Sequence, residues 1–322
     1  MLAIAFAGSV LTLQSPVFGQ EPPKTSSSSV IDVIAMNVKA TPEAKAYYLL
    51  QLAYCYCTGG DTTGLEIHIK SNLIKSDNLS LFYSSYRGEP FLGSWASSVS
   101  LLSQSVAKEE QSKTGDTKIS KEHRTFADKA ITAAVAQLGS DFKEPLALKL
   151  NMYLIASCLS RITGNTQNEQ MCTKELNAAI QACEASKTVD SGQIKAVASI
   201  LNSMAFGLIP IRIPDYQAQS PSQLPEFDRK NFDESERLRL RAAALLDRLP
   251  TGDQERRKAH RDLSLWYSQL GRDDKALKEK EELFKLVGVK DDRILYPQSG
   301  VCGHPMWWTT EKLTYESNCG MG

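Results

Sequence analysis

The sequence predicts an all-α protein, and three observations support this prediction. Apolar residues recur at the three-to-four-residue spacing of a helix in nearly every segment after residue 42. No run of neighbouring segments shows the alternation that is typical of strands. The connections between successive helical patterns are short, which favours antiparallel hairpins that pack in sequence order. With 322 residues, of which 42% are apolar, the chain can bury a sizeable core.

Residues 1–19 have the pattern of a secretory signal peptide. An apolar run extends from Leu2 to Leu13, and Val17 and Gly19 occupy positions −3 and −1 of a cleavage site before Gln20. No Lys or Arg precedes the run, so an atypical signal, an upstream start or a buried N-terminal helix remain open. The run is shorter than the roughly 18 residues of a spanning helix, so we expect no membrane span after signal cleavage. We expect a secreted or periplasmic protein.

Residues 20–41 are predicted to form a Ser/Pro-rich tether, because the segment EPPKTSSSS has the composition of a linker. A helical repeat domain of about nine to eleven helices is expected over 42–290. Its clearest helical patterns fall, in order, at 49–56, 127–138, 176–183, 194–204, 238–249, 263–270 and 276–287. Thr251 and Gln254 have the spacing of a capping box just before one of these patterns.

Two segments interrupt the helical patterns. Residues 109–122 are polar, and residues 207–233 carry Pro210, Pro214, Pro221 and Pro225. Proline excludes a regular helix from the second segment. Long connections inside helical domains often carry function. This insertion is interpreted either as a functional loop or as a linker between two helical halves.

Two helix ends share one spacing of a large apolar residue, a small residue, an aromatic residue and a glycine. The positions are Leu52, Ala53, Tyr56 and Gly60 in LAYCYCTGG, and Leu263, Ser264, Tyr267 and Gly271 in LSLWYSQLG. This spacing resembles the first helix of the tetratricopeptide repeat, a 34-residue helical hairpin. Ala276 follows Gly271 where the second helix of that repeat carries a small residue, whereas Leu65 departs from the pattern after Gly60.

A weaker copy of the pattern, ASCLSRITG, ends at Gly164. The intervals from Gly60 to Gly164 and from Gly164 to Gly271 each span about three repeats. The resemblance is good over 254–288, fair over 44–76 and poor elsewhere. It implies helical hairpins stacked as an α-solenoid, whose concave groove holds a peptide or protein partner. An irregular helical bundle is the alternative.

Residues 291–322 concentrate reactive and aromatic side chains. A disulfide between Cys302 and Cys319 would close a small loop, stabilising by roughly 3 kcal/mol in the chain-entropy model. Trp307 and Trp308 would then cover the last hairpin. Cys302, His304 and Cys319 could instead be zinc ligands, or Cys302 and His304 a nucleophile and its base. The tight Cys302–His304 spacing and the lack of a fourth ligand favour the disulfide-closed aromatic tail.

The chain has seven cysteines, an odd number, so at least one is unpaired within the chain. Cys158 and Cys172 are equidistant from residue 165 in a predicted turn. Facing positions in an antiparallel hairpin predict a second disulfide between them. Cys183 is expected to pack as a small apolar side chain, while Cys55 and Cys57 point in different directions from one helix.

The charge balance and the motifs indicate a binding protein. Lys and Arg total 37, as do Asp and Glu, so nucleic acid is not an expected partner. The four histidines are dispersed, and none of the common hydrolase, zinc-protease or nucleotide-binding motifs is present. We expect an exported helical-repeat protein that holds a peptide or protein and has no cofactor. The alternative is an all-α enzyme or metal-binding protein that uses Cys302, His304 and Cys319.

Overall fold

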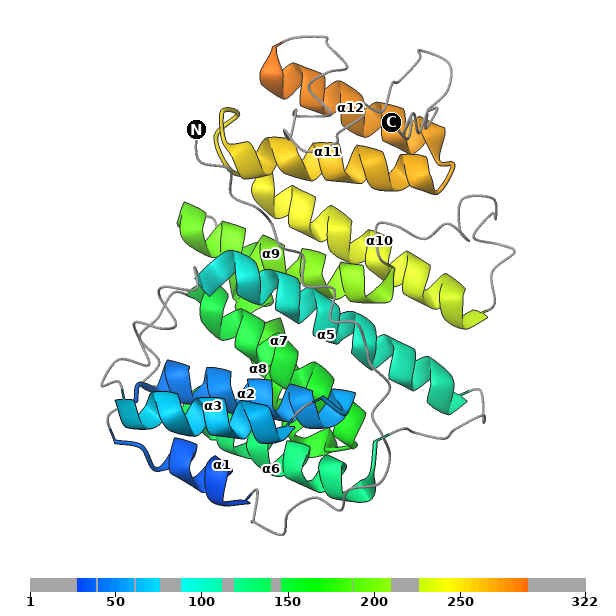
Figure 1. Cartoon of the computed structure of the whole chain (residues 1–322). Coiled ribbons are helices and arrows are strands. Elements are labelled where there is room, and N and C mark those ends of the chain that lie inside the picture. The colour runs from blue at the N-terminus through cyan, green and yellow to red at the C-terminus, as the bar shows by residue number, and fades with distance from the viewer. Residues whose placement is uncertain are drawn as a thin grey trace, which may run out of the picture.

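The computed structural model describes residues 28–38, 40–60, 62–75, 88–111, 119–139, 146–186, 188–209 and 226–288, and over these ranges the protein is all-helical, as predicted. The helices of the described ranges are α1 (Ser28–Ala35), α2 (Pro42–Thr58), α3 (Thr62–Lys75), α5 (Gly88–Gln111), α6 (Lys121–Gln137), α7 (Leu146–Thr163), α8 (Thr166–Ala185), α9 (Ser191–Leu208), α10 (Glu226–Leu246), α11 (Gln254–Gln269) and α12 (Asp273–Val287). Figure 1 shows them stacked, with α11 and α12 at one end and α1 at the other.

Helix α1 lies inside the range predicted to be a tether. Val30, Ile31 and Ile34 are buried, and α1 packs on α6 and α2. These three apolar residues share one face of a helix, which gives the short segment an apolar surface to bury. The preceding run of serines hides this pattern in the sequence. The helical domain therefore begins by residue 28 and not at residue 42.

The C-terminal half is built from helices that pack in sequence order. Helix α7 packs on α8, α9 on α10, and α11 on α12. Helix α7 also contacts α9, and α10 contacts α11, so each pair touches the next. Stacked pairs of this kind are what a helical solenoid requires.

The N-terminal half packs differently. The main neighbour of α2 is α6 and not α3, and α5 crosses both α7 and α9. A single glycine allows the close approach of α5 to α9. A Cβ atom added at Gly207 would lie 1.9 Å from Ser100 Oγ. Sequence-order stacking and an irregular bundle therefore meet within one molecule.

The two predicted breaks are shorter than expected. Helix α9 continues to Leu208 and α10 already begins at Glu226, so residues 210–225 of the proline-rich segment are the part outside the described ranges. Similarly, α5 extends to Gln111 and α6 begins after its N-cap Ser120, whose side chain accepts a hydrogen bond from the His123 amide. The polar composition of residues 109–122 obscured the ends of α5 and α6, and the prolines of residues 207–233 obscured those of α9 and α10.

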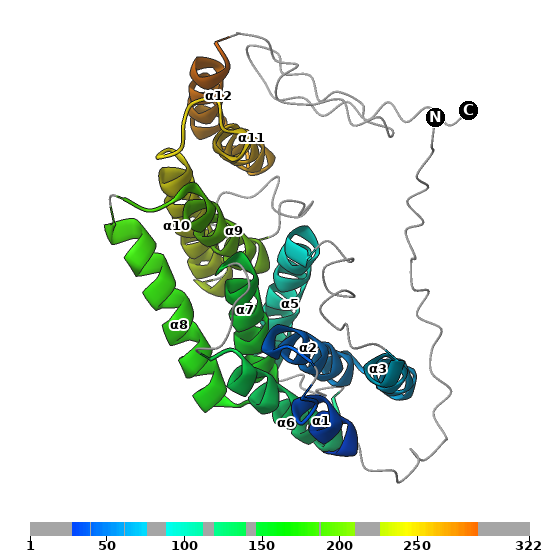
Figure 2. The ribbon, with the colours of Figure 1, turned by 90° about the vertical axis from the view of Figure 1, so that its left-hand side faces the viewer.

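The stack is curved. Figure 2 shows α8 on the outer side of the curve, α5 and α2 on the inner side, and α9 between α10 and α5. The largest buried cluster extends from α1 to Leu249. A second cluster surrounds Trp266 and joins α10, α11 and α12. Within it, the rings of Phe232 and Trp266 stack with centroids 5.4 Å apart.

Candidate functional site

Seven of the predicted repeat positions are buried in the core: Leu52, Ala53, Tyr56, Leu263, Ser264, Tyr267 and Ala276. The two aromatic positions make different contacts. Tyr56 donates a hydrogen bond to Glu66 on the following helix, and Tyr267 donates one to Glu236 on the preceding helix, each at 2.8 Å. Ser264 Oγ donates to the Ala276 carbonyl at 2.9 Å and thereby joins α11 to α12.

The glycines of the repeat pattern are only partly equivalent. Gly271 has a φ of 65° after α11, in the left-handed region that favours glycine. At the end of α2 it is Gly59, with a φ of 67°, that takes this conformation. Gly60, which was predicted to end that helix, comes one residue after Gly59 and has no positive φ. The spacing from the aromatic residue to the helix cap therefore differs between the two copies.

Cys158 and Cys172 are thiols in the structure, and no disulfide joins them. Both are buried, on α7 and α8 respectively, and Cys158 lies beside Ser100 on α5. Burial raises the pKa of the Cys158 thiol to about 11 and that of Cys172 to about 12. The predicted hairpin geometry brings them to neighbouring helices, but the contact with α5 occupies the Cys158 side chain. They pack as small apolar groups.

The predicted C-terminal site lies outside the described residues. This applies to Cys302, His304, Cys319, Trp307 and Trp308. Within the described ranges, no group of three His, Cys, Asp or Glu side chains could hold a metal ion. None of the helices described is long and apolar enough to cross a membrane.

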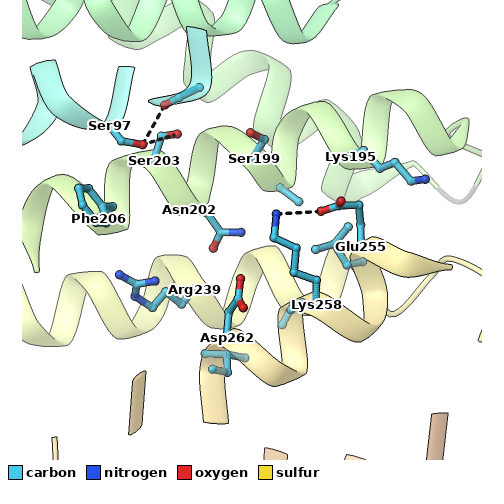
Figure 3. Close-up of a pocket in the computed structure, with 16 residues that line it drawn as sticks. Ser97, Lys195, Ser199, Asn202, Ser203, Phe206, Arg239, Glu255, Lys258 and Asp262 are labelled. Atoms are coloured by element: carbon cyan, nitrogen blue, oxygen red, sulfur yellow. Dashed lines mark hydrogen bonds and ion pairs between the residues drawn. The ribbon is translucent and has the colours of Figure 1, made fainter. Parts of the chain in front are cut away.

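A pocket lies where α5, α9, α10 and α11 meet, with a volume of about 420 Å³ (Figure 3). Small and polar side chains from α5 and α9 form one side, and charged side chains from α10 and α11 form the other. The residues that line it are Gly93, Ser97, Lys195, Ala198, Ser199, Asn202, Ser203, Phe206, Arg239, Ala243, Leu246, Glu255, Lys258, Ala259, Asp262 and Leu263.

The α9 side of the pocket presents groups that can make hydrogen bonds. Ser199 and Asn202 are exposed there, and Ser97 on α5 donates to Ser203 Oγ at 3.1 Å. Phe206 adds a half-buried aromatic side chain at one end (Figure 3). Ser199, Asn202, Ser203 and Phe206 are one to four positions apart, so one face of α9 carries all four.

Ion pairs surround the α11 side of the pocket. Lys258 pairs with Glu255 at 3.6 Å, and Asp262 accepts from Arg261 at 2.9 Å. At the start of α11, Lys195 pairs with Asp253 at 2.8 Å. This hydrogen bond is the main cause that lowers the pKa of Asp253, which also caps the helix. Each lysine that lines the pocket therefore already has a carboxylate partner.

Arg239 has no such partner among the described residues. Its side chain is 5% exposed, and its guanidinium lies 4.9 Å from the centroid of the Trp266 ring. Nη2 donates to the Ile209 carbonyl at 3.0 Å, while Nε has no hydrogen-bond partner among the described residues. Burial lowers the pKa of Arg239 to about 10, and the negative charge of Asp262 opposes this effect.

Comparisons with protein-family models, with curated proteins and with solved structures returned no match for this chain. The lining of the pocket contains neither histidine nor cysteine. Its hydroxyls, amide and charged groups can hold a polar ligand by hydrogen bonds and ion pairs, while Phe206 and Leu263 can contact an apolar part.

His260 lies on α11, outside the pocket lining. It is buried between two carboxylates close to the end of α10. Its Nδ1 lies 2.8 Å from Glu279 Oε2 and its Nε2 lies 3.0 Å from Asp247 Oδ1. Burial alone lowers the pKa of His260, but the two hydrogen-bonded carboxylates outweigh it and raise the pKa above 6.5. The buried ring thereby links α11, α12 and the segment after α10.

Sequence reasoning missed the pocket, because its residues come from four helices and have no common spacing. One signal for it does exist in the sequence. Arg239 falls on the same helical face as Phe232, Ala243 and Leu246, so a cation interrupts an otherwise apolar stripe. A charge at such a position requires a partner or a ligand once the face is buried.

Proposed function

We propose that this protein is an exported helical-repeat binding or scaffold protein that holds a segment of a peptide or protein partner in the pocket between α5, α9, α10 and α11. The observation that carries the proposal is the pocket itself. Four helices bring hydrogen-bonding, charged and apolar side chains together around one pocket with a volume of about 420 Å³. Binding sites for flexible ligands combine these same three kinds of group.

The packing of the helices supports this proposal. The pairs α7/α8, α9/α10 and α11/α12 follow one another, and each touches the next. Stacked helical pairs form curved surfaces that bind extended partners. The residues that line the pocket come from α5, α9, α10 and α11, and Figure 2 shows α5 and α8 on opposite sides of α9. Export rests on the signal-like pattern of residues 1–19, and the resemblance to tetratricopeptide repeats on the two matched helix ends.

Site-specific photo-crosslinking tests the proposal. A benzophenone amino acid at Asn202 stands at the exposed edge of the pocket, and the same group at Gln181 stands on the outer helix α8. Both positions are exposed, so the substitutions should leave the fold intact. We expect the Asn202 probe to join one partner segment in an extract of the native host, identified by mass spectrometry. The Gln181 probe should not join that segment.

A blocking variant completes the test. Ser199→Trp would fill the pocket from its exposed α9 side and should abolish the crosslink at Asn202. Gln181→Trp is the matched control and should leave the crosslink unchanged. Crosslinking that is equal at Asn202 and Gln181, or that survives Ser199→Trp, would show that the partner does not occupy the pocket.

A further inference from the structure

We infer that the pocket between α5, α9, α10 and α11 binds a carboxylate group and that Arg239 is its principal donor. The inference deepens the proposed function and rests on it, because it names the chemistry of the group that enters the same pocket. Arg239 lines the pocket and, among the arginines whose side chains are described, is the one that is buried. A buried cation is costly unless it is paired and hydrogen-bonded.

The hydrogen bonds of Arg239 are incomplete in a specific way. A guanidinium carries five N–H donors in a planar fork. Nη2 donates to the Ile209 carbonyl, and the face of the group lies over Trp266. Nε, which is the inner prong of the fork that pairs with a carboxylate, has no partner among the described residues. Nε is itself enclosed, so a carboxylate in the pocket would pair with the outer edge of the guanidinium that carries Nη1, to which the described residues offer no hydrogen-bond acceptor.

No carboxylate of the described residues compensates the charge of Arg239 directly. The negative charge of Asp262 raises the pKa of Arg239, but the two side chains form no ion pair. The Asp262 carboxylate instead accepts a hydrogen bond from Arg261. The two lining lysines differ, since Lys195 pairs with Asp253 and Lys258 with Glu255. Within the described part of the chain, Arg239 is thus the pocket cation that is left for a ligand.

The charge of the lining favours a singly charged anion. The described lining residues include three cations and two carboxylates, which leaves one excess positive charge: Lys195, Arg239 and Lys258 against Glu255 and Asp262. A carboxylate matches that excess, whereas a phosphate dianion would place a second negative charge near the two acidic side chains. Such a carboxylate could be a side chain or chain end of the partner, or a free small acid.

NMR of the 15N-labelled protein provides a direct test. The Arg239 Nε–H signal is assigned as the one that disappears in Arg239→Met. The probes are acetyl-Ala-Ala-Ala with a free C-terminus, the same peptide amidated, acetyl-Ala-Glu-Ala amide, acetate and inorganic phosphate. We expect a saturable shift of the Nε–H signal with at least one carboxylate probe. The fully amidated trialanine should bind about tenfold more weakly or worse, because it lacks the charged acceptor.

The five probes also separate the sources of the carboxylate. If acetate binds as tightly as the two acidic peptides, the ligand is a free small acid. Preference for the peptide with a free C-terminus indicates a chain end, and preference for the glutamate peptide indicates a side chain. Binding of phosphate in preference to every carboxylate would overturn the inference. So would equal binding of acid and amide, or the absence of a saturable shift with each carboxylate at about 10 mM.

Arg241→Met is the matched control, because Arg241 lies two residues away on α10 and pairs at the surface with Glu184. Arg239→Met should remove the preference for acid over amide, and Arg241→Met should keep it. If Arg239→Met does not fold, Arg239→Lys retains the charge without the fork and should reduce the preference.

The proposed function can fail separately from this inference. A crosslinked partner at Asn202 with no preference for acid over amide contradicts only the carboxylate inference. Acid binding without a crosslink contradicts only the macromolecular partner.

Discussion

At Gly207 the backbone of α9 comes so close to α5 that no side chain fits between them. An added Cβ would lie 1.9 Å from Ser100 Oγ, 2.5 Å from Ser100 Cβ and 2.9 Å from the Ser100 carbonyl carbon. The last of these atoms belongs to the backbone, so a rotamer change alone cannot make room. One turn away, Ser97 and Ser203 hydrogen-bond across the same crossing. Glycine is needed here for close approach and not for its backbone angles.

Gly207→Ala should therefore destabilise the protein by about 1–3 kcal/mol, the usual cost of overpacking a core contact. Denaturant unfolding monitored by circular dichroism measures the change. Gly252→Ala is the control, because nothing lies within 4 Å of a Cβ built at Gly252. It should shift the free energy of unfolding by less than about 0.5 kcal/mol. Equal effects from the two variants would contradict the close contact of α5 with α9.

Tyr267 combines a buried ring with one hydrogen bond. Its hydroxyl donates to Glu236, which also pairs with Lys275. Tyr267→Phe should cost about 1 kcal/mol by removing this bond, and Tyr267→Ala about 3–5 kcal/mol by also leaving a cavity. Lys285→Ala is the control at an exposed position paired only locally with Glu282, and it should leave the unfolding midpoint unchanged. A Tyr267→Ala protein as stable as Tyr267→Phe would contradict the burial of the ring.

At the scale of the helix, His260 ties three segments together. Its ring joins Glu279 on α12 to Asp247 after α10, and Asp247 also pairs with Arg256. A neutral imidazole has only one N–H, so it can donate to only one of the two carboxylates. Both contacts are hydrogen-bonded in full when the histidine is protonated. The protonation state of His260 thus contributes to the attachment of the last hairpin, together with the Tyr267–Glu236 hydrogen bond and the cluster around Trp266.

The stability of the wild type should consequently fall as the pH rises. The pKa of His260 is raised in the folded protein, so its contribution is fully present below the unfolded pKa of about 6.5 and is lost as the pH rises through the higher folded value. Thermal unfolding between pH 6 and 8.5 measures this change. The difference in stability between wild type and His260→Gln should shrink over this range. A difference that does not change with pH would show that His260 does not titrate as described.

Most helices could be predicted from the sequence, because the periodicity of apolar residues is local. The pairs α7/α8 and α11/α12 also followed, since short connections force neighbours to pack. The pairing of α2 with α6 and of α5 with α7 and α9 could not, because apolar stripes do not specify distant partners. Helix α1 was missed because three buried residues follow a serine-rich run. The pocket was missed because it exists only where four helices converge.

Across the whole molecule, burial is unevenly distributed. Helix α7 lies at the centre and contacts α2, α5, α6, α8 and α9, and most of its residues are buried. The main packing partner of α12 is α11, and its buried residues are Ala276, Lys280 and Leu283. The cluster around Trp266 borders on the larger cluster through Leu208 and Ala259. The last hairpin can therefore open while the centre of the fold stays closed.

Hydrogen exchange followed by mass spectrometry should reveal this gradient. Amides of α12 and α11 should exchange first and those of α7 last, because local opening costs less where fewer buried contacts are broken. Tyr267→Phe weakens the joint between α10 and α11, so it should speed exchange in α11 and α12 and leave α7 unchanged. Gly207→Ala acts on the crossing of α5 and α9 and should instead speed exchange in α5 and α9. Exchange that rises uniformly over all helices in both variants would mean that the molecule unfolds as one unit. The pocket, which spans α5, α9, α10 and α11, would then be lost only by global unfolding and not by opening of the last hairpin.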